Sequence, residues 1–460
     1  MKRVLHAPDD PDDVAHAIGE HPAVAACAVV FREAVPRHQR LVAYVVPVQD
    51  RPEFWPALGD YGIYNAHLYR SLTYDTIKNA AYRAAIRAHV SGKTAVDIGT
   101  GPDAILARLC VEAGARRVYA IEIREDACHL ARGLVSRLGL ADRIEIVQGD
   151  AARVKLPERV DVCVSETIGV VGSSEGAALL LTSARRLLKD GGTMIPRRCV
   201  TRIAAVSLPR HLAACPKPGS LSTAYLRSVV RQVGYPFDLR LCIANLSADH
   251  LVSDSVVFED LDFTRSLAPS WHRDVSLTMT RSGDCQGFVA WINLETGAGQ
   301  AVDSLRDACN WAPCFFPMSG PALRVRKRDV MVARCSGCPG HHPYTMDYRI
   351  EGRLVRRDVK LAEVHCESVC HTRAFRDTPF YRRFFRGVTP GGGMRVSMDR
   401  TGVEFVADLK RHLHRLVPRR TVPSLFVLLR ALPLGADGEV DLESLPAVDL
   451  FAAPPRRHGH

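Results

Sequence analysis

The sequence predicts an α/β fold: a doubly wound parallel sheet, followed by an antiparallel barrel-like β domain, with two halves of a small α+β subdomain at the flanks. Three observations predict it. Strands alternate with helices between residues 94 and 196, β-type runs separated by turns follow from about residue 206, and helix-plus-strand patterns stand at both ends. An apolar content of 47% in 460 residues allows a large core divided among several domains.

The first element predicted is a helix followed by two strands. An Asp cap precedes Val14, Ile18 and Val24, and the β-branched runs ACAVVF and LVAYVVP follow up to Pro47. Residues 55–90 are predicted to be helical because apolar residues recur there at roughly helical spacing: Tyr64, Leu68, Leu72, Ile77 and Tyr82.

The Rossmann-like parallel sheet is predicted from alternating strand and helix patterns. The strands are 94–98, 118–123, 143–148, 160–165 and one starting at GGTMIP (191–196). The intervening helices are 104–115, 127–140 and 176–188. The later β-type runs are 255–263, 274–281, 287–295, 323–335 and 344–352, and an amphipathic helix is expected over 404–417.

These patterns predict five segments. Residues 1–50 and 401–451 form the two parts of the flanking subdomain, 51–205 the parallel-sheet domain, 206–400 the β-rich domain, and 452–460 a disordered tail. No run of 18 apolar residues or signal-like N-terminus occurs in this sequence, so we expect no membrane span and a cytoplasmic protein.

The net charge is +11, but the Arg residues are spread along the chain and no RNA-binding motif stands out, so we expect no nucleic-acid partner. The charge is compatible with an acidic protein partner or with none. The 14 cysteines are expected to be mostly reduced core residues.

Three strand ends carry the predicted cofactor site. Asp97, Gly99 and Gly101 lie in VDIGTG, where a strand enters a turn that lets backbone approach a ligand. Glu122 ends the next strand and could bind ribose hydroxyls, and Asp150 ends the third and could bind an adenine edge. The turn lacks the third glycine of a dinucleotide fingerprint, which favours a ligand without pyrophosphate.

The segment from Asp97 to Pro196 resembles the catalytic core of the protein arginine methyltransferases, through DIGTG, AGARRVYAIE, IVQGD, LPERVDVCVSE and LLKDGGTMIP. The resemblance implies S-adenosyl-L-methionine as cofactor and a dimer. In DTIKNAAY, Lys78 stands where the family has an Arg that contacts the donor's carboxylate, and Tyr61 and Tyr64 fall in its N-terminal aromatic segment. A Lys ammonium can pair with a carboxylate, but not bidentately.

Glu166 and Glu175 in SETIGVVGSSEG have the nine-residue separation of the family's double-glutamate loop, which implies a catalytic role. Two carboxylates can bind a guanidinium by bidentate hydrogen bonds and aim one nitrogen at a sulfonium methyl group. No metal is required. Asn310 and Trp311 stand where the family has His-Trp, and we expect them at the substrate. Asn310 cannot take a proton, which puts a peptide-arginine substrate in doubt.

The flanks resemble the C-terminal subdomain of a nonribosomal peptide synthetase adenylation domain, split by the insert. HPAVAACAVVFRE and RLVAYVVP carry the first part of the likeness, and VPRRTVPSLFVLLRALPL and ADGEVDLESLP the second. Glu439 fills the adenylation lysine position, so we expect no adenylation. The flanks are interpreted either as a folded relic or as a surface that docks a carrier protein.

Two questions stay open at this stage. Cys335 and Cys338, with His and Cys residues downstream, could form a structural zinc site or an ordinary turn. For function, the hypotheses are guanidino N-methylation of arginine or an arginine-like small molecule in natural-product biosynthesis, methylation of an aminoacyl group on a carrier protein, or a non-catalytic docking module.

Overall fold

The computed structural model describes residues 10–35, 38–48, 51–57, 72, 75–218, 226, 229–231, 234, 237–297, 299–342, 344–370, 378–385, 400–429, 431–434 and 439–446. The chain divides into two compact units. The first comprises Met1–Asp50, Thr73–Ala80 and Val396–His460, and the second comprises Arg51–Leu72 and Ala81–Arg395. Each is described by itself.

The first unit is assembled from both ends of the chain. Its helices are α1 (Pro11–Gly19), α10 (Arg400–Leu416) and the short η3 (Arg419–Thr421), and its strands are β1 (Val24–Val35), β2 (His38–Pro47) and β21 (Leu425–Leu428). β1 and β2 pair antiparallel, and β21 pairs parallel to β2. The Asp10 side chain caps α1 by accepting a hydrogen bond from Asp12 N at 3.0 Å, which is worth about 1 kcal/mol at a helix start.

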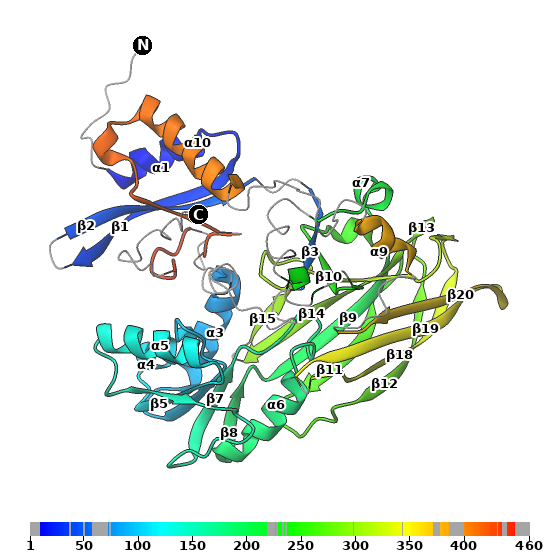
Figure 1. Cartoon of the computed structure of the whole chain (residues 1–460), viewed down its shortest axis with the longest axis horizontal. Coiled ribbons are helices and arrows are strands. Elements are labelled where there is room, and N and C mark those ends of the chain that lie inside the picture. The colour runs from blue at the N-terminus through cyan, green and yellow to red at the C-terminus, as the bar shows by residue number, and fades with distance from the viewer. Residues whose placement is uncertain are drawn as a thin grey trace. The chain divides into compact units, whose positions relative to one another are not determined.

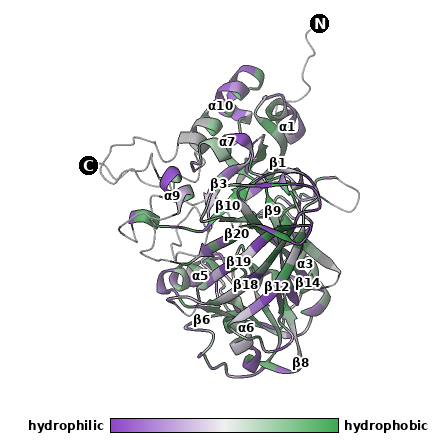
Figure 2. Cartoon of the chain, turned by 90° about the vertical axis from the view of Figure 1, so that its right-hand side faces the viewer, coloured by the Kyte–Doolittle hydropathy of each residue, from purple (hydrophilic) through white to green (hydrophobic). Residues whose placement is uncertain are grey.

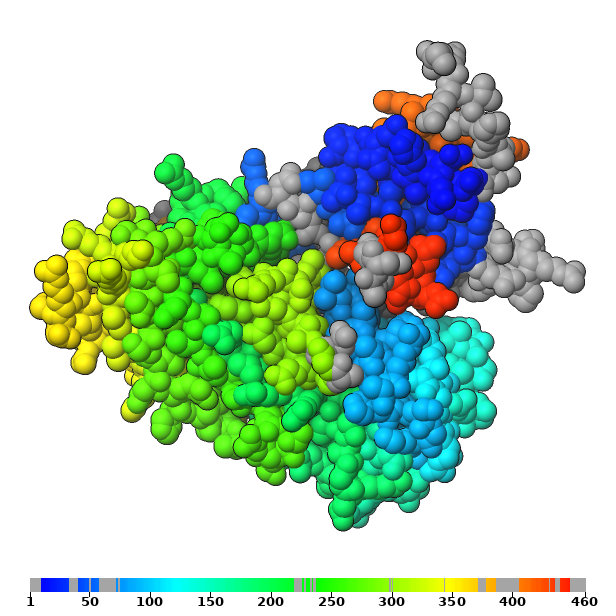
Figure 3. Space-filling model, turned by 180° about the vertical axis from the view of Figure 1, so that it is seen from behind, coloured from blue at the N-terminus to red at the C-terminus, as the bar shows by residue number. Residues whose placement is uncertain are grey.

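One apolar core joins the two ends in this unit. Val14 and Ile18 of α1 pack with Leu409 and Leu413 of α10. On the other side of the sheet, the buried Tyr44 donates a hydrogen bond to Pro446 O at 2.6 Å. Figure 3 shows the C-terminal segment, in red, beside the N-terminal strands, in blue. Residues more than 350 positions apart therefore fold as one subdomain.

The second unit contains a parallel sheet in which the described strands take the order β6-β5-β4-β7-β8 (Figure 1). They are β4 (Thr94–Ile98), β5 (Arg117–Glu122), β6 (Ile144–Gln148), β7 (Val160–Ser165) and β8 (Leu188–Ile195). The connecting helices are α4 (Ile105–Glu112), α5 (Glu125–Arg137), α6 (Ala177–Ala184) and η1 (Arg185–Leu187). The strand order reverses at β4, and ligands of open α/β sheets bind where this reversal places the carboxyl ends of neighbouring strands. The parallel-sheet prediction is confirmed.

Antiparallel sheets complete the second unit. One has the order β11-β9-β14-β16-β10-β3, with β15 beside β14, and another the order β12-β18-β19-β20, while β13 pairs with β17. Buried and more exposed residues alternate along much of β18 and β20, as expected for a sheet with one buried face, and Figure 2 shows both hydrophobic and hydrophilic segments in this part of the chain. A barrel-like closure stays a prediction.

The antiparallel strands of this unit are β3 (Glu53–Pro56), β9 (Arg198–Val206), β10 (Leu241–Ala244), β11 (Val256–Asp262), β12 (Trp271–Thr278), β13 (Gly283–Cys285), β14 (Gly287–Gly297), β15 (Gln300–Asp303), β16 (Cys314–Pro317), β17 (Leu323–Val325), β18 (Val330–Pro339), β19 (Met346–Arg356) and β20 (Val359–Ser368).

Short helices accompany these sheets: α7 (Arg210–Ala214), η2 (Ala248–His250) and α9 (Pro379–Phe384). Phe54, Phe315, Phe380 and Phe384 form an aromatic cluster in the main core of this part. Helix α3 (Thr76–His89) crosses the division between the units after Ala80.

Three predicted elements differ from the structure. Residues 55–56, where the helical segment was predicted to begin, belong to strand β3, because Phe54 is fully buried and Trp55 pairs with Cys242 of β10, a partner far along the chain. The predicted helix 176–188 ends at Ala184 and continues as η1, and β8 begins at Leu188 rather than in the glycine pair that follows. Strands β3 and β9 belong to the antiparallel sheet although they precede residue 206.

Candidate functional site

The glycine turn after β4 has a left-handed backbone and packs closely against its neighbours. Gly99 has a φ of +75°, and a Cβ on it would lie 3.0 Å from Thr167 Cγ2. The amides of Gly99 and Thr100 both donate to Ile121 O of β5, at 2.9 and 3.1 Å. The turn is therefore fixed to the neighbouring strand, and its first position has no space for a side chain.

Asp97 lies within β4 with a buried carboxyl group, 1% exposed. Its Oδ2 accepts hydrogen bonds from Thr100 Oγ1 at 2.6 Å and Ala107 N at 3.1 Å, whereas Oδ1 has no partner among the described residues. Burial raises the pKa of Asp97 to about 7, against the opposing effect of the Thr100 hydroxyl. A buried acceptor without a partner is costly, so this oxygen fits a cationic or hydrogen-bonding ligand group such as an ammonium.

Glu122 ends β5 and binds the glycine turn. Its Oε2 accepts a hydrogen bond from Gly101 N at 3.0 Å, and its Oε1 accepts one from Arg124 N at 2.9 Å. A carboxylate offers about four acceptor sites. Glu122 therefore keeps capacity for two hydroxyl donors, which is what binding a ribose requires.

Asp150 follows β6, and the structure brings it an unexpected partner. Tyr344, in the connection between β18 and β19, donates its hydroxyl to Asp150 Oδ1 at 2.6 Å, and Ala152 N donates to the same oxygen at 2.9 Å. Burial and this hydrogen bond raise the pKa of Tyr344 to about 12. No local pattern indicated Tyr344, because it is 194 positions from Asp150.

Lys78 lies in the first helical turn of α3 and is buried, 2% exposed. Asp75 caps this turn, with Oδ1 accepting a hydrogen bond from Lys78 N at 2.9 Å. Both residues belong to the first unit, so a cofactor-binding role for Lys78 stays a prediction. Tyr82, in the part of α3 that belongs to the second unit, is fully buried and donates to Ser165 O of β7 at 2.8 Å.

The two predicted catalytic acids stand at the ends of one buried loop between β7 and α6, here called the glutamate loop (residues 166–176). Residues 168–174 are all buried, whereas Glu166 and Glu175 are partly exposed. Burial raises the pKa of Tyr82 and of Asp97, and the charge of Glu166 adds to this in both cases, so Glu166 lies near both groups. The two acids are thus accessible to a ligand, whereas residues 168–174 between them are not.

The antiparallel sheets hold this loop. Trp311, 4% exposed, donates its indole N–H to Ile168 O at 2.8 Å. Thr201 Oγ1 of β9 accepts a hydrogen bond from Gly172 N at 3.0 Å. At Gly176, where φ is +78°, a Cβ would lie 2.6 Å from the Cα of Tyr344. Trp311 is therefore hydrogen-bonded directly to the glutamate loop.

Asn310 is half-buried beside Trp311, and its carbonyl accepts a hydrogen bond from Ala312 N at 3.0 Å. Its substrate role stays a prediction. Tyr61 and Tyr64 lie outside the described residues.

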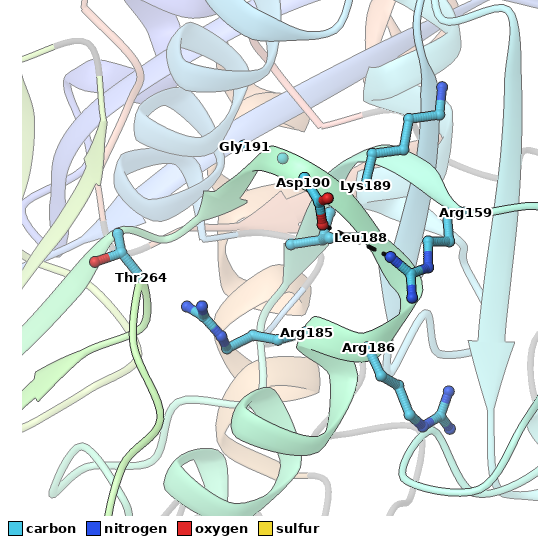
Figure 4. A pocket seen from close by; sticks show the side chains of 9 residues that line it. Arg159, Arg185, Arg186, Leu188, Lys189, Asp190, Gly191 and Thr264 are labelled. Carbon is cyan, nitrogen blue, oxygen red and sulfur yellow. Dashed lines mark ion pairs between the residues drawn. The ribbon is translucent and has the colours of Figure 1, made fainter.

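A polar surface pocket of about 370 Å³ lies around η1 and β8, away from the strand ends above. Its cationic side chains point in different directions, and Arg159 is paired with Asp190 at 3.7 Å (Figure 4). Because the cations do not converge, this pocket is not a candidate active site. It is lined by Arg159, Arg185, Arg186, Leu188, Lys189, Asp190, Gly191, Gly192 and Thr264.

Cys335 and Cys338 lie in strand β18, three positions apart, where one is buried and the other exposed. Side chains three apart in a strand point to opposite faces. In the described part of the chain, no group of three or more His, Cys, Asp or Glu residues could hold a metal ion. None of the described helices is long and apolar enough to cross a membrane.

Comparison with known proteins agrees with this geometry. Residues 95–192 match the family model of a methyltransferase domain. The Arginine N(omega)-methyltransferase of Streptomyces achromogenes subsp. streptozoticus is 27% identical over 260 residues, which are 54% of this chain and 70% of the relative. Protein arginine N-methyltransferase PRMT10 of Arabidopsis thaliana is 40% identical over 126 residues, which are 26% of this chain and only 32% of the plant protein.

Among solved structures, the Arabidopsis thaliana protein arginine methyltransferase 10 superposes with a TM-score of 0.55 at 21% identity, covering 66% of this chain and 97% of that one. This likeness concerns the fold. Together with the matched domain and the cofactor-side geometry, the comparisons define the class: the chain contains an S-adenosylmethionine-dependent methyltransferase domain, and S-adenosyl-L-methionine is its cofactor.

Proposed function

We propose that the protein transfers a methyl group from S-adenosylmethionine to a guanidino nitrogen of arginine or of an arginine-like small molecule. The names of the sequence relatives support arginine as the acceptor class. Asn310, which stands where the family has a His that can take a proton, supports a small-molecule acceptor rather than a peptide arginine.

The observation that carries the proposal is the glutamate loop: two partly exposed carboxylates, Glu166 and Glu175, at the ends of a buried segment beside the cofactor strand. A guanidinium is fully charged at neutral pH and is a poor nucleophile. Two carboxylates bind its N–H groups, hold its charge on the far nitrogens and leave one nitrogen facing the donor.

The remaining residues bind and orient. Asp97 would hold the cofactor's ammonium, Glu122 its ribose hydroxyls and Asp150 its adenine edge, while Gly99 and Gly101 would let the backbone approach it. When bound, the cofactor supplies an electrophilic sulfonium methyl group.

The reaction is a displacement whose acceleration comes mainly from aligning the guanidino nitrogen with the methyl group. The guanidino nitrogen forms an N–C bond, the S–C bond breaks with its electron pair returning to sulfur, and one N–H proton passes to a carboxylate of the loop and then to solvent. Asn310 and Trp311, with Tyr61 and Tyr64, complete the acceptor side. No metal is needed for this chemistry.

A second candidate is methylation of an aminoacyl group held on a peptidyl carrier protein. It is favoured by the first unit, in which β2 and β21 from opposite ends of the chain pair in parallel, as expected for a synthetase-like subdomain split by an insert. In either case we place the protein in nonribosomal-peptide-type natural-product biosynthesis. We also propose a homodimer, which sedimentation would test.

One assay separates the candidates. The full chain is incubated with methyl-labelled S-adenosylmethionine and free arginine, an arginine-containing peptide, or arginyl-loaded carrier protein. Label on free arginine is expected. Label on the loaded carrier alone supports the second candidate, and label on the peptide alone, or on no acceptor, contradicts the proposed small-molecule acceptor.

A further inference from the structure

Glu259 of β11 is a buried carboxylate that the proposed reaction does not use. It is 3% exposed, and among the described residues neither Lys nor Arg pairs with it. Its partners are hydrogen-bond donors: Ser173 N at 2.9 Å, the Ser173 hydroxyl, Trp271 Nε1 at 2.9 Å and the Thr201 side chain. Burial raises the pKa of Glu259, and the hydrogen bonds from Ser173 oppose this.

A buried carboxylate without a counter-cation is costly unless donors satisfy it. Two of its donors come from the same residue, Ser173, and that residue lies between the two acceptor acids. Glu259 therefore holds both the main chain and the side chain of the glutamate loop at one point. A hydrophobic residue at this position would fill space but leave the Ser173 amide buried without an acceptor.

The surroundings of Glu259 are rigid. Trp271 packs edge-on against Phe258, with ring centroids 4.9 Å apart. The Ser173 hydroxyl also lies 3.0 Å from Tyr348 Oη, and the buried Arg240 guanidinium stands 4.9 Å from the Tyr348 ring centroid. The anchor is thus fixed in the antiparallel sheets rather than in the loop.

We propose that Glu259 is a positioning residue: through Gly172–Ser173 it sets the separation and orientation of Glu166 and Glu175, and so the geometry of the acceptor clamp. This inference rests on the proposed function. It assigns to the antiparallel sheets the placement of the acceptor acids, while the parallel sheet places the cofactor.

If Glu259 is a positioning residue, its substitution should lower kcat and leave cofactor affinity nearly unchanged. Glu259→Gln keeps the size of the side chain but turns an amide N–H₂ toward the Ser173 donors. The loop then shifts while the strand ends at Asp97 and Glu122 stay in place. Misplacement by about 1 Å reduces rates by about 100-fold, so kcat should fall by about 10- to 100-fold while the Kd for S-adenosylmethionine changes less than twofold.

Asp329→Asn is a matched control. Asp329 is also a buried carboxylate of this unit, 1% exposed, but it pairs with Arg356 at 2.7 Å and with the turn at Arg326, away from the glutamate loop. We expect it to lower the Tm without changing kcat. Ser173→Ala is a milder variant that removes only the hydroxyl; if Glu259 acts through Ser173, the double variant should be little worse than Glu259→Gln alone.

The experiment measures kcat, KM, cofactor affinity by calorimetry, and amide hydrogen exchange of peptides covering residues 168–176. Hydrogen exchange is measured without a methyl acceptor. It therefore tests whether Glu259 holds the glutamate loop even if the methyl acceptor has been assigned wrongly. Faster exchange in Glu259→Gln but not in Asp329→Asn, with a lower kcat, supports the inference. Unchanged exchange, equal changes in both variants, or a loosened loop with native kcat overturns it.

Discussion

Tyr344 donates a hydrogen bond of 2.6 Å to Asp150, which joins the hairpin between β18 and β19 to the strand end where we place the cofactor's adenine. The same tyrosine backbone packs on Gly176 at the end of the glutamate loop. Tyr344, in the connection between β18 and β19, therefore contacts both Asp150 and the end of the glutamate loop.

Tyr344→Phe should weaken cofactor binding. The hydroxyl donates to Oδ1 of Asp150, so its loss removes one of the contacts that orient this carboxylate. A net contribution of about 1 kcal/mol corresponds to a roughly fivefold higher Kd for S-adenosylmethionine, measured by calorimetry. Tyr119→Phe, which removes a hydroxyl bonded to Glu158 at 3.3 Å, is the control and should leave the Kd unchanged. Equal effects of the two variants would contradict the role of Tyr344.

Asp97 predicts a pH dependence of cofactor affinity. Its pKa is raised to about 7 in the folded chain, above the unfolded value near 3.9, so the folded state binds the extra proton between these values. Its contribution to stability is therefore greatest at low pH and declines as pH rises from about 4 to about 7. A cationic ligand group requires the charged form, so affinity should increase up to about pH 7 and then level off.

Calorimetry between pH 5.5 and 7.5 measures this dependence. Asp97→Asn cannot ionise, so it should bind more weakly and lose the slope. A native protein whose affinity is independent of pH over this range would show that Asp97 does not face the cofactor's cation.

Gly99→Ala tests the close approach at the turn. The positive φ costs about 1–2 kcal/mol of stability for a residue with a Cβ, and the methyl group would also crowd Thr167. Gly92→Ala is matched, since Gly92 has a φ of +71° with nothing within 4 Å of the added Cβ. Both variants should lose similar stability in thermal unfolding, but only Gly99→Ala should lose cofactor affinity, by about tenfold or more. Native affinity in Gly99→Ala would place the cofactor elsewhere.

The sequence predicted what depends on local pattern. Strands β4 to β7 are short runs that end at, or are followed by, a glycine or an acid, and their alternation with helices predicts a parallel sheet without knowledge of distant partners. Glu122 and Asp150 could be predicted to belong to one site because strand ends of such a sheet share one edge.

What the sequence could not predict depends on long-range pairing. Trp55 and Pro56 looked helical, yet β3 forms because β10 pairs with it. Glu259, Ser173 and Tyr344 have no distinctive spacing, and their meaning appears only where the sheets bring them to the glutamate loop. The pairing of β2 with β21 is of the same kind, although the likeness of the two flanks to one subdomain pointed toward it.

The central claim is that Glu166 and Glu175 hold the guanidino group. Glu166→Gln keeps the shape of the side chain and removes one charge. Methyl transfer to the acceptor should fall by about 100-fold or more, because one partner of a charged pair is lost. The Kd for S-adenosylmethionine should stay within about twofold of the native value. The control is Glu158→Gln, which alters a surface acid paired with Arg116 at 3.2 Å and should be fully active. Transfer by Glu166→Gln within about threefold of the native rate, with cofactor still bound, would contradict the account.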